Sequence, residues 1–564
     1  MDIRQRISLV CTGALLSAAL FLTPAAAEER YILKVDSIQG DQIVCTLGEL
    51  TQTSPGSQPG GALPQPPEVE WPGKDDAGGT PPEFPAGERP SETGPQGPEG
   101  GQPGGWSEFV SSDETLTFTL ADDTTVTVEF LQGSRQSDAA SIAENAVLEV
   151  VLRDDGSAAT VVVRNLQAGG GFGGGKEVTN GSASTTLDAD AVIADETYTS
   201  TGSDENALRI DGAQVSLTGV TIEKKAGESS NIEDGDFYGA NAGLLALNGA
   251  AVNITGAQVY SDAVNGNGVF SYGKGTTVNI ADSVIRTSQR NSGGIQTTGG
   301  ATMNASNLDV ETQGASSAAI RSDRGGGDVN VSGGTYVTHG AGSPAIYSTA
   351  DIEVADAALI ANASEAVVVE GKNSVSLEDC TVTGSMTGTY DDGGENIHNI
   401  MIYQSMSGDA AIGLATFSAS GGSITSLSGD MFYVTNTACT IDLSGVELAL
   451  ANDTLLRVEG NASPRGWGQQ GANGGDVTLN ADAQALAGVI AVDGISALRA
   501  SLTNGSQFTG AVNPAGLAGD VRLTLDDTST WTLTADSYLS VFEGDTSQVS
   551  AGGYHLYVGG EQVL

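Results

Sequence analysis

Val252-Asn253-Ile254, Val278-Asn279-Ile280, Met303-Asn304-Ala305 and Val329-Asn330-Val331 repeat one short phrase through the middle of the chain. Their asparagines are 26, 25 and 26 residues apart. A constant period of about 20 to 50 residues is typical of repeat architectures, in which each unit buries its apolar face by stacking on its neighbours. The phrase therefore predicts an elongated solenoid, which also suits a chain of 564 residues better than one compact core does.

A second phrase keeps the same period and divides each repeat into short strands. In the repeat that begins with Ala319-Ile320-Arg321, we expect strands at 319–321, 329–331 and 335–338, separated by turns rich in glycine and aspartate. Strand triplets with about 25 residues per turn close into a coil of parallel strands. Side chains alternate along a strand, so the asparagine of each Val-Asn-Ile phrase should point outward. We expect the four asparagines to form a ladder of paired amides, with ligand binding as the alternative role.

The first 27 residues have the composition of a secretory signal peptide. Arg4 and Arg6 supply its charged region, Leu9 to Leu22 its apolar region, and Ala25-Ala26-Ala27 a cleavage site. The apolar run is short for a bilayer span. We therefore expect a secreted or cell-surface protein with no transmembrane span once the signal is removed.

Strand-like alternation at 31–50 returns at 113–166, on either side of a segment, 54–105, that is rich in proline, glycine and glutamate. That segment has too little apolar content to offset the entropy of ordering, so we expect disorder there. Two strands alone are not stable, so the flanking strands should pair. The predicted order is a small β domain at 28–166, a glycine-rich hinge at 167–176, a parallel β-helix at 177–530 and a C-terminal cap at 531–564.

The charge is strongly acidic: 70 Asp and Glu residues oppose 23 Lys and Arg residues, for a net charge of −47. This balance argues against nucleic acids and anionic membranes as partners. Cys45, Cys380 and Cys439 remain after the signal peptide, and an odd, widely spaced set predicts buried free thiols and not a disulfide framework.

Three glycine-punctuated phrases carry a resemblance to a known family. They are Ser317-Ala318-Ala319-Ile320-Arg321-Ser322-Asp323-Arg324-Gly325-Gly326-Gly327, Gly342-Ser343-Pro344-Ala345-Ile346-Tyr347-Ser348-Thr349-Ala350 and Glu370-Gly371-Lys372-Asn373-Ser374. From about residue 176 onward the chain resembles right-handed parallel β-helix proteins of the pectin-lyase-like superfamily, especially exported adhesin-like or carbohydrate-binding ones. The resemblance implies an all-β fold and a polysaccharide or cell-surface glycan as partner.

Basic residues are scarce, and the repeat brings several of them into line. We align Arg321 with Tyr347 and Val369, and Ser322 with Glu370. Adjacent turns of such a coil lie about 4.8 Å apart. Arginine forks onto carboxylates and tyrosine offers an apolar face, which suits sugars or uronates. The predicted ligand-binding residues are Arg321, Asp323, Arg324, Tyr347, Glu370 and Lys372, and the alternative is a structural network of ion pairs between turns.

The same residues leave an enzymatic alternative open. The resemblance to polysaccharide lyases implies Arg321 or Lys372 as a base, with Asp323 and Glu370 beside a Ca²⁺ ion. A glycoside hydrolase would use a pair of carboxylates, either Asp323 and Glu370 or Asp391 and Asp392. We assign no catalytic residue on this basis.

Two acidic segments interrupt the repeat. Residues 385–415 break the period and hold Asp391, Asp392 and Glu395, candidate Ca²⁺ ligands whose alternative is a solvated turn. Residues 233–236 read Glu-Asp-Gly-Asp and look like a loop insertion that lengthens one turn. No segment after the signal peptide has a helical period.

These observations favour a secreted or surface-exposed, non-catalytic protein that binds glycans or surface polymers. The alternatives are a lyase or hydrolase acting on acidic polysaccharide, and a spacer whose small domain does the binding.

Overall fold

The computed structural model describes residues 30–39, 42–53, 106–130, 133–137, 142, 146–153, 155–164, 179–388, 396–405, 407–462 and 467–564. The predicted signal peptide, the segment 54–105 and the hinge at 167–176 lie outside the described residues.

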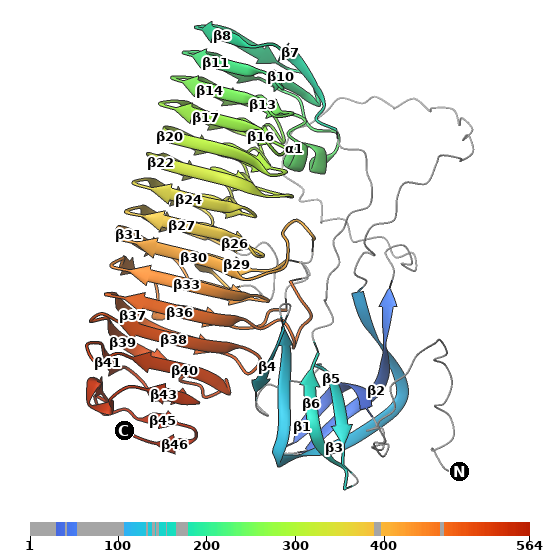
Figure 1. Cartoon of the computed structure of the whole chain (residues 1–564), viewed down its shortest axis with the longest axis vertical. Coiled ribbons are helices and arrows are strands. Elements are labelled where there is room, and N and C mark those ends of the chain that lie inside the picture. Colours follow the sequence, from blue (N-terminus) through green and yellow to red (C-terminus); the bar gives the residue numbers. More distant parts are fainter. Residues whose placement is uncertain are drawn as a thin grey trace, which may run out of the picture.

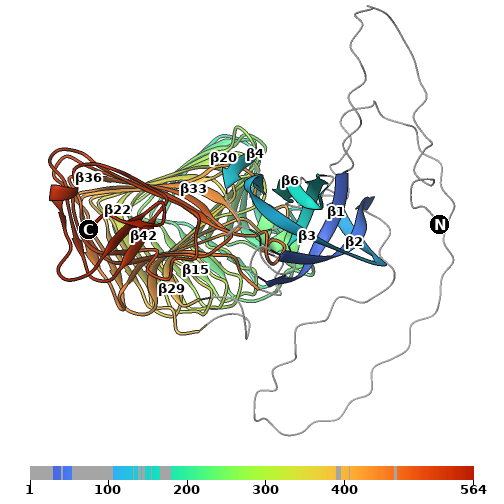
Figure 2. The same ribbon diagram turned by 90° about the horizontal axis from the view of Figure 1, so that it is seen from below.

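From β7 (Ser182–Leu187) to β44 (Val549–Ser550) the chain is a parallel β-helix, which confirms the predicted fold class (Figure 1). One turn consists of β13 (Leu244–Leu247), β14 (Ala251–Thr255) and β15 (Gln258–Ser261), and each strand pairs in parallel with its counterpart one turn later. The first strands of successive turns form a 15-stranded sheet, and the second and third strands together form a 22-stranded sheet. Viewed from below, the turns superimpose around a common axis (Figure 2).

The core lies inside this coil because apolar residues alternate with polar ones along each strand. In β14, Val252 and Ile254 point inward and are at most 2% exposed, whereas their neighbours are exposed. One hydrophobic cluster runs continuously from Ala207 to Leu556. Each turn therefore depends on its neighbours for burial, as solenoids do.

Two turns depart from the three-strand expectation. β20 (Ala301–Thr312) and β22 (Gly327–Thr338) each run unbroken across two faces of the coil. In β22 the bend falls at Gly333 and Gly334, whose positive φ angles of 67° and 96° glycine adopts without strain. The expected strands at 329–331 and 335–338 are thus one strand.

The outward asparagines form the predicted ladder. The Nδ2 atoms of Asn279, Asn304 and Asn330 each donate to the Oδ1 atom of the asparagine one turn earlier, over 2.9, 2.8 and 2.9 Å. The pairing is side chain to side chain, so these amides help to hold the turns in register.

We expect Asn304→Ala to destabilise the β-helix by about 1–3 kcal/mol, because it removes both ladder bonds that involve Asn304 and each net bond contributes about 0.5–1.5 kcal/mol. Asn253→Ala removes one bond and should cost less. Denaturant titration of both variants measures the two losses in free energy of unfolding. Equal losses would contradict the ladder bonds as the cause.

The expectation of a loop at residues 233–236 is wrong. Residues 233–236 lie in a helix, α1 (Ile232–Tyr238), which is capped by the side chain of Asn231 and ended by Gly239 at φ 68°. Seven residues are too few to show a helical period. The interruption at 385–415 also contains a strand that the sequence did not predict, β29 (His398–Tyr403), which is fully buried in the 15-stranded sheet.

The N-terminal domain is one six-stranded sheet in the order β2-β1-β5-β6-β3-β4. As predicted, strands on both sides of residues 54–105 pair with each other, β2 with β3 and β1 with β5. The strands are β1 (Arg30–Gln39), β2 (Gln42–Thr53), β3 (Trp106–Phe130), β4 (Gly133–Ser137), β5 (Val147–Leu152) and β6 (Ser157–Val163).

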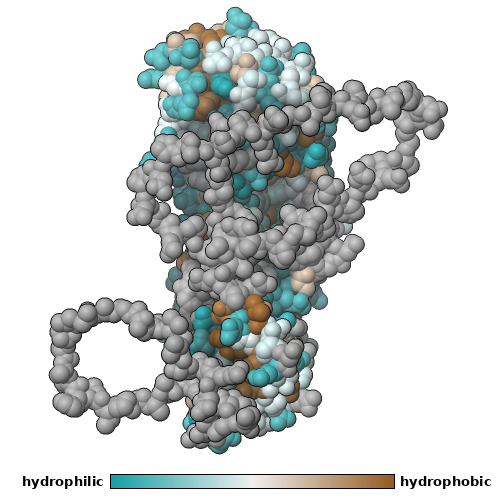
Figure 3. Space-filling model, turned by 90° about the vertical axis from the view of Figure 1, so that its right-hand side faces the viewer, coloured by the Kyte–Doolittle hydropathy of each residue, from teal (hydrophilic) through white to brown (hydrophobic). Residues whose placement is uncertain are grey.

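The two ends of the coil differ. The first turn, with β7 and β8 (Ala191–Ala194) at the upper end of Figure 1, leaves Val192 88% exposed, and Figure 3 shows apolar residues on the surface at that end. At the other end, β41 (Thr530–Leu533) still pairs in parallel with the preceding turn, so the coil extends into the range assigned to the cap. β45 (Leu556–Val558) and β46 (Glu561–Gln562) then close the chain as an antiparallel hairpin.

The described residues include three cysteines and one α-helix. Cys45, Cys380 and Cys439 are buried free thiols, as predicted. No helix in this part of the chain has the length and apolar composition to span a bilayer.

Candidate functional site

The outer face of the 15-stranded sheet gathers most of the predicted site residues. Arg321 lies on β21 (Ile320–Ser322) and pairs with Tyr347 on β23 (Ile346–Ser348), as the repeat predicts. Tyr347 in turn pairs with Val368 on β26 (Val367–Glu370) and not with Val369, so the predicted register is wrong by one residue. Val369 belongs to the core, and Glu370 therefore lies on the same outer face as Tyr347.

The register could not be read from this strand because Val367, Val368 and Val369 are all apolar. Alternation reveals which residue faces inward only where one face is polar. Val368 instead packs outside the coil in a second cluster with Met401, Tyr403, Tyr433 and Trp467.

Arg321 is the centre of a buried ion-pair network. Its Nη2 atom lies 2.7 Å from Oδ2 of Asp323 and 3.4 Å from Oδ2 of Asp236, and its Nε donates to the same Asp323 oxygen over 2.9 Å. The Arg321 side chain is 11% exposed and that of Asp323 6%. The predicted proximity of Arg321 and Asp323 is therefore present, together with Asp236, which the sequence did not place there.

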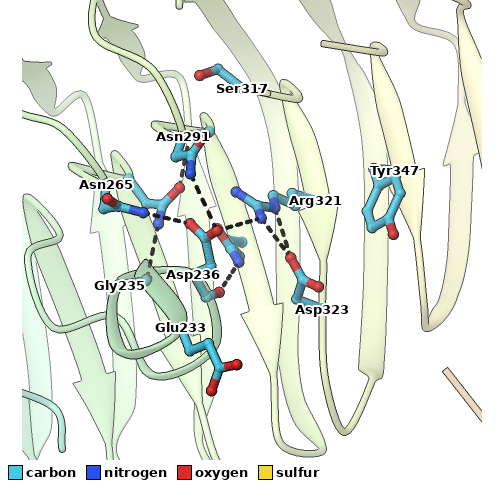
Figure 4. A network of polar contacts seen from close by, with 12 residues as sticks. Glu233, Gly235, Asp236, Asn265, Asn291, Ser317, Arg321, Asp323 and Tyr347 are labelled. Atoms are coloured by element: carbon cyan, nitrogen blue, oxygen red, sulfur yellow. Dashed lines mark hydrogen bonds and ion pairs between the residues drawn. The ribbon is translucent and has the colours of Figure 1, made fainter. Parts of the chain in front are cut away.

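Asp236 reaches this network because α1 lies across the outer face of the sheet (Figure 4). Its carboxylate accepts hydrogen bonds from Asn265 over 2.8 Å and from Asn291 over 3.5 Å. Its backbone carbonyl accepts from Gln296 over 2.5 Å, and that of Phe237 accepts from Thr298 over 2.7 Å. Side chains from three successive turns thus hold α1 in place on the outer face of the sheet.

Arg324 connects α1 with the segment that carries Asp409. Its Nε and Nη2 atoms donate to Oδ1 of Asp409 over 3.1 and 2.8 Å, and its guanidinium lies 4.1 Å from the ring centre of Phe237. Lys372, by contrast, is exposed, and no ion pair or hydrogen bond of its side chain is present among the described residues. The structure does not bring Lys372 into the cluster.

Glu370 is held by hydroxyl groups. Tyr403 donates to its Oε2 over 2.9 Å, Tyr347 donates to the same oxygen, and Ser405 donates to Oε1. Burial raises the pKa of Glu370, while the three hydroxyl donors oppose that rise. The ring of Tyr403 also packs edge-on against Trp467, with centroids 4.9 Å apart.

A pocket of about 280 Å³ lies among these groups, although Arg324 and Glu370 are not part of its lining. α1 contributes Asp236 and Phe237, and the sheet contributes Arg321, Tyr347 and Tyr403. Further charged and aromatic lining comes from Asp323, Glu365, Asp409 and Trp467. Asp236, Phe237, Glu365, Tyr403, Asp409 and Trp467 were not among the predicted site residues.

Only one feature of the sequence pointed toward a missed residue. The insertion at 233–236 lengthens one turn, and its helix carries Asp236. Asp409, 85 residues from Arg324, and Trp467 leave no signal in the repeat, because both lie in irregular segments whose position depends on tertiary packing.

Acidic groups outnumber basic ones around Asp323. Burial raises the pKa of Asp323 to about 7, and Asp236, Asp409 and Glu370 add to the rise, whereas Arg321 opposes it. Burial alone would lower the pKa of Arg321, but Asp236 and Asp323 raise it. The short ion pair favours a charged Asp323 and the other acids favour a protonated one. We hold that the pKa of Asp323 is raised, because one guanidinium cannot neutralise several carboxylates.

The raised pKa of Asp323 makes the stability of the fold depend on pH. A carboxyl group whose folded pKa is raised stabilises the folded state below its unfolded pKa of about 3.9, and that contribution is lost as the pH rises through about 7. We expect Asp323→Asn to reduce the fall in melting temperature between pH 4 and 8 (roughly the interval between those two pKa values). Asp328→Asn, at an exposed site on β22, is the matched control and should leave the pH profile unchanged. A profile that is identical in both variants would contradict the shift.

The metal prediction receives no support from the described residues. No group of three or more His, Cys, Asp and Glu side chains in them is arranged to hold a metal ion. Asp391, Asp392 and Glu395 lie outside the described residues.

Comparison of the chain with protein-family models, with curated proteins and with solved structures finds no match.

Proposed function

We propose that this chain is a secreted or surface-exposed, non-catalytic protein that binds a glycan in the pocket beside α1. The observation that carries the proposal is the lining: aromatic rings of Phe237, Tyr347, Tyr403 and Trp467 share one concave site with carboxylates and a guanidinium. Binding sites for small ligands combine an apolar wall with a few fixed polar groups in this way. Sugar rings present both an apolar C–H face and hydroxyl groups, so they match both parts.

The walls of the pocket also support binding more than turnover. α1 is fixed by hydrogen bonds from three turns, and Arg321, the residue that a lyase would use as a base, is engaged with Asp236 and Asp323. Lys372, the other candidate base, does not line the pocket. A prearranged, ion-paired site keeps its groups in place for recognition.

Trp467 offers a direct test because its side chain, although only 2% exposed, lines the pocket. The full chain is screened on a glycan array, and each hit is titrated while tryptophan fluorescence is followed. Trp467→Ala should abolish the fluorescence response and weaken binding at least tenfold (about 1.4 kcal/mol). Tyr260→Ala, at an aromatic residue that is 41% exposed outside the pocket, should bind as the parent does. If no glycan or surface polymer binds, the proposal fails.

A glycoside hydrolase is the second candidate. A general acid needs a raised pKa, and Asp323, with a pKa of about 7, shares the pocket with the carboxylates of Glu365 and Asp409. Incubation with the glycans that bind, followed by an assay for new reducing ends, tests this candidate. Product that disappears in Asp323→Asn while binding persists would favour the hydrolase over the non-catalytic protein.

A further inference from the structure

The pocket carries more acid than its basic groups can neutralise. Asp236, Asp323, Glu365 and Asp409 line it, and Arg321 is the one basic residue in that lining. Glu370 lies outside the lining and accepts a hydrogen bond from the Tyr347 hydroxyl. Arg324 pairs with Asp409, which leaves an excess of carboxylates even when both arginines are counted.

Three of these carboxylates keep one oxygen without a hydrogen-bond partner among the described residues. Asp323 receives both of its bonds from Arg321 at Oδ2, which leaves Oδ1 open. Asp409 receives both bonds from Arg324 at Oδ1, which leaves Oδ2 open. Glu365 accepts from Ser364 at Oε2, which leaves Oε1 open. Asp323 is only 4% exposed and lines the pocket, so its open oxygen is an acceptor in the wall of the pocket.

A carboxylate in a largely buried site costs free energy unless nearby cations or donors compensate for its lost hydration. A cationic donor in the pocket would remove that cost. The aromatic rings in the same lining favour the same kind of group, because the faces of tyrosine and tryptophan attract cations.

We infer that the pocket selects a saccharide unit that carries a free primary amine, with its ammonium group at Oδ1 of Asp323 and its ring against Tyr347, Tyr403 and Trp467. This inference rests on the proposed function and names the class of sugar. It also replaces the expectation that Arg321 recognises uronates, because Nε and Nη2 of the guanidinium already pair with acids, Nη1 is buried, and a further carboxylate would add to the acidic excess.

The pH dependence of binding follows from the groups that face the site. Below about pH 7 Asp323 is largely protonated in the free protein, so binding of an ammonium group must release a proton. Affinity for an amine should therefore rise as the pH rises toward 7, whereas affinity for a neutral sugar should not. The titratable and charged groups around the site are Glu233, Asp236, Arg321, Asp323, Arg324, Tyr347, Glu365, Glu370, Tyr403 and Asp409.

The test is isothermal titration calorimetry of the full chain with three probes: a glucosamine tetramer, its N-acetylated counterpart and a galacturonate tetramer. At pH 7 we expect the amine probe to bind at least tenfold more tightly than the N-acetylated one (about 1.4 kcal/mol), and the galacturonate probe to bind least. Asp323→Asn should remove the preference for the amine while binding of the N-acetylated probe remains. Asp328→Asn, the exposed acidic control, should keep the preference.

Each other result overturns the inference. Equal affinity for the amine and N-acetylated probes, or tightest binding of galacturonate, would overturn it while the proposed function stands. A preference for the amine that survives in both Asp323→Asn and Asp409→Asn would overturn the assignment to these carboxylates, and Asp409→Asn also serves if the first variant does not fold. If no saccharide of any charge binds, the proposed function fails with it.

Discussion

Replacing Arg321 with alanine should destabilise the β-helix by about 3–5 kcal/mol, since removal of one partner of a buried ion pair leaves an uncompensated charge. Asp236 and Asp323 would both lose their guanidinium, and they are only 9% and 4% exposed. The loss should appear as a lower denaturant midpoint of the β-helix transition.

Arg286 is the matched control. It also pairs with two acids, Asp309 at 2.5 Å and Glu311 at 3.4 Å, but its side chain is 31% exposed and that of Asp309 56%. Water solvates the acids that remain, so Arg286→Ala should cost about 1 kcal/mol or less. Similar losses in the two variants would show that burial does not set the effect.

The cost of Arg321→Ala should also depend on pH. The acids that it leaves behind are neutral at low pH and charged at high pH, and burial raises the pKa of both Asp236 and Asp323. The difference from the parent should therefore be small near pH 4 (close to the unfolded pKa of aspartate, about 3.9) and grow as the pH rises through 7. A difference that is constant with pH would contradict charge as the cause.

Trp531→Ala should have the second large effect, about 3–5 kcal/mol, because it removes the largest fully buried side chain at the end of the coil. Trp531 is 0% exposed, stacks on Phe508 with centroids 5.9 Å apart, and donates from Nε1 to the carbonyl of Gly510 over 3.0 Å. Since neighbouring turns carry most contacts in a solenoid, the loss should be local.

Hydrogen exchange measures that locality. We expect faster exchange in β39 (Gln507–Val512), β41 and the closing hairpin, and unchanged exchange around Asn279. Tyr557→Ala, at a half-buried ring that stacks on Tyr538 with centroids 4.7 Å apart, is the control and should affect the hairpin alone. Uniform loss of protection along the whole coil would contradict the nearest-neighbour account.

The repeat was sufficient to predict the coil because its signal is local and periodic. Val252 and Ile254 flank a polar asparagine, and that alternation fixes which side chains enter the core. The same reasoning placed Arg321 beside Tyr347 correctly. The predicted register is wrong by one residue at Val367-Val368-Val369, because all three residues are apolar and the alternation carries no information there.

The pocket could be predicted only in part. Arg321, Asp323, Arg324, Tyr347 and Glu370 do lie close together, but Lys372 does not join them, and the walls come from residues that no alignment of turns relates. Asp236 lies 85 residues before Arg321 in the chain, and it reaches Arg321 only because a seven-residue helix crosses the outside of the coil.

By itself, the amino-acid sequence determined that this protein forms a coil of parallel strands, with a ladder of asparagines outside and aliphatic residues inside, because both depend on spacing along the chain. The tertiary structure decided what stands on the outer face of the sheet. α1, Asp409 and Trp467 occupy segments without period, and their positions depend on contacts between turns that are distant in sequence. The charge of the pocket, and with it the kind of sugar that we expect it to bind, depends on those contacts.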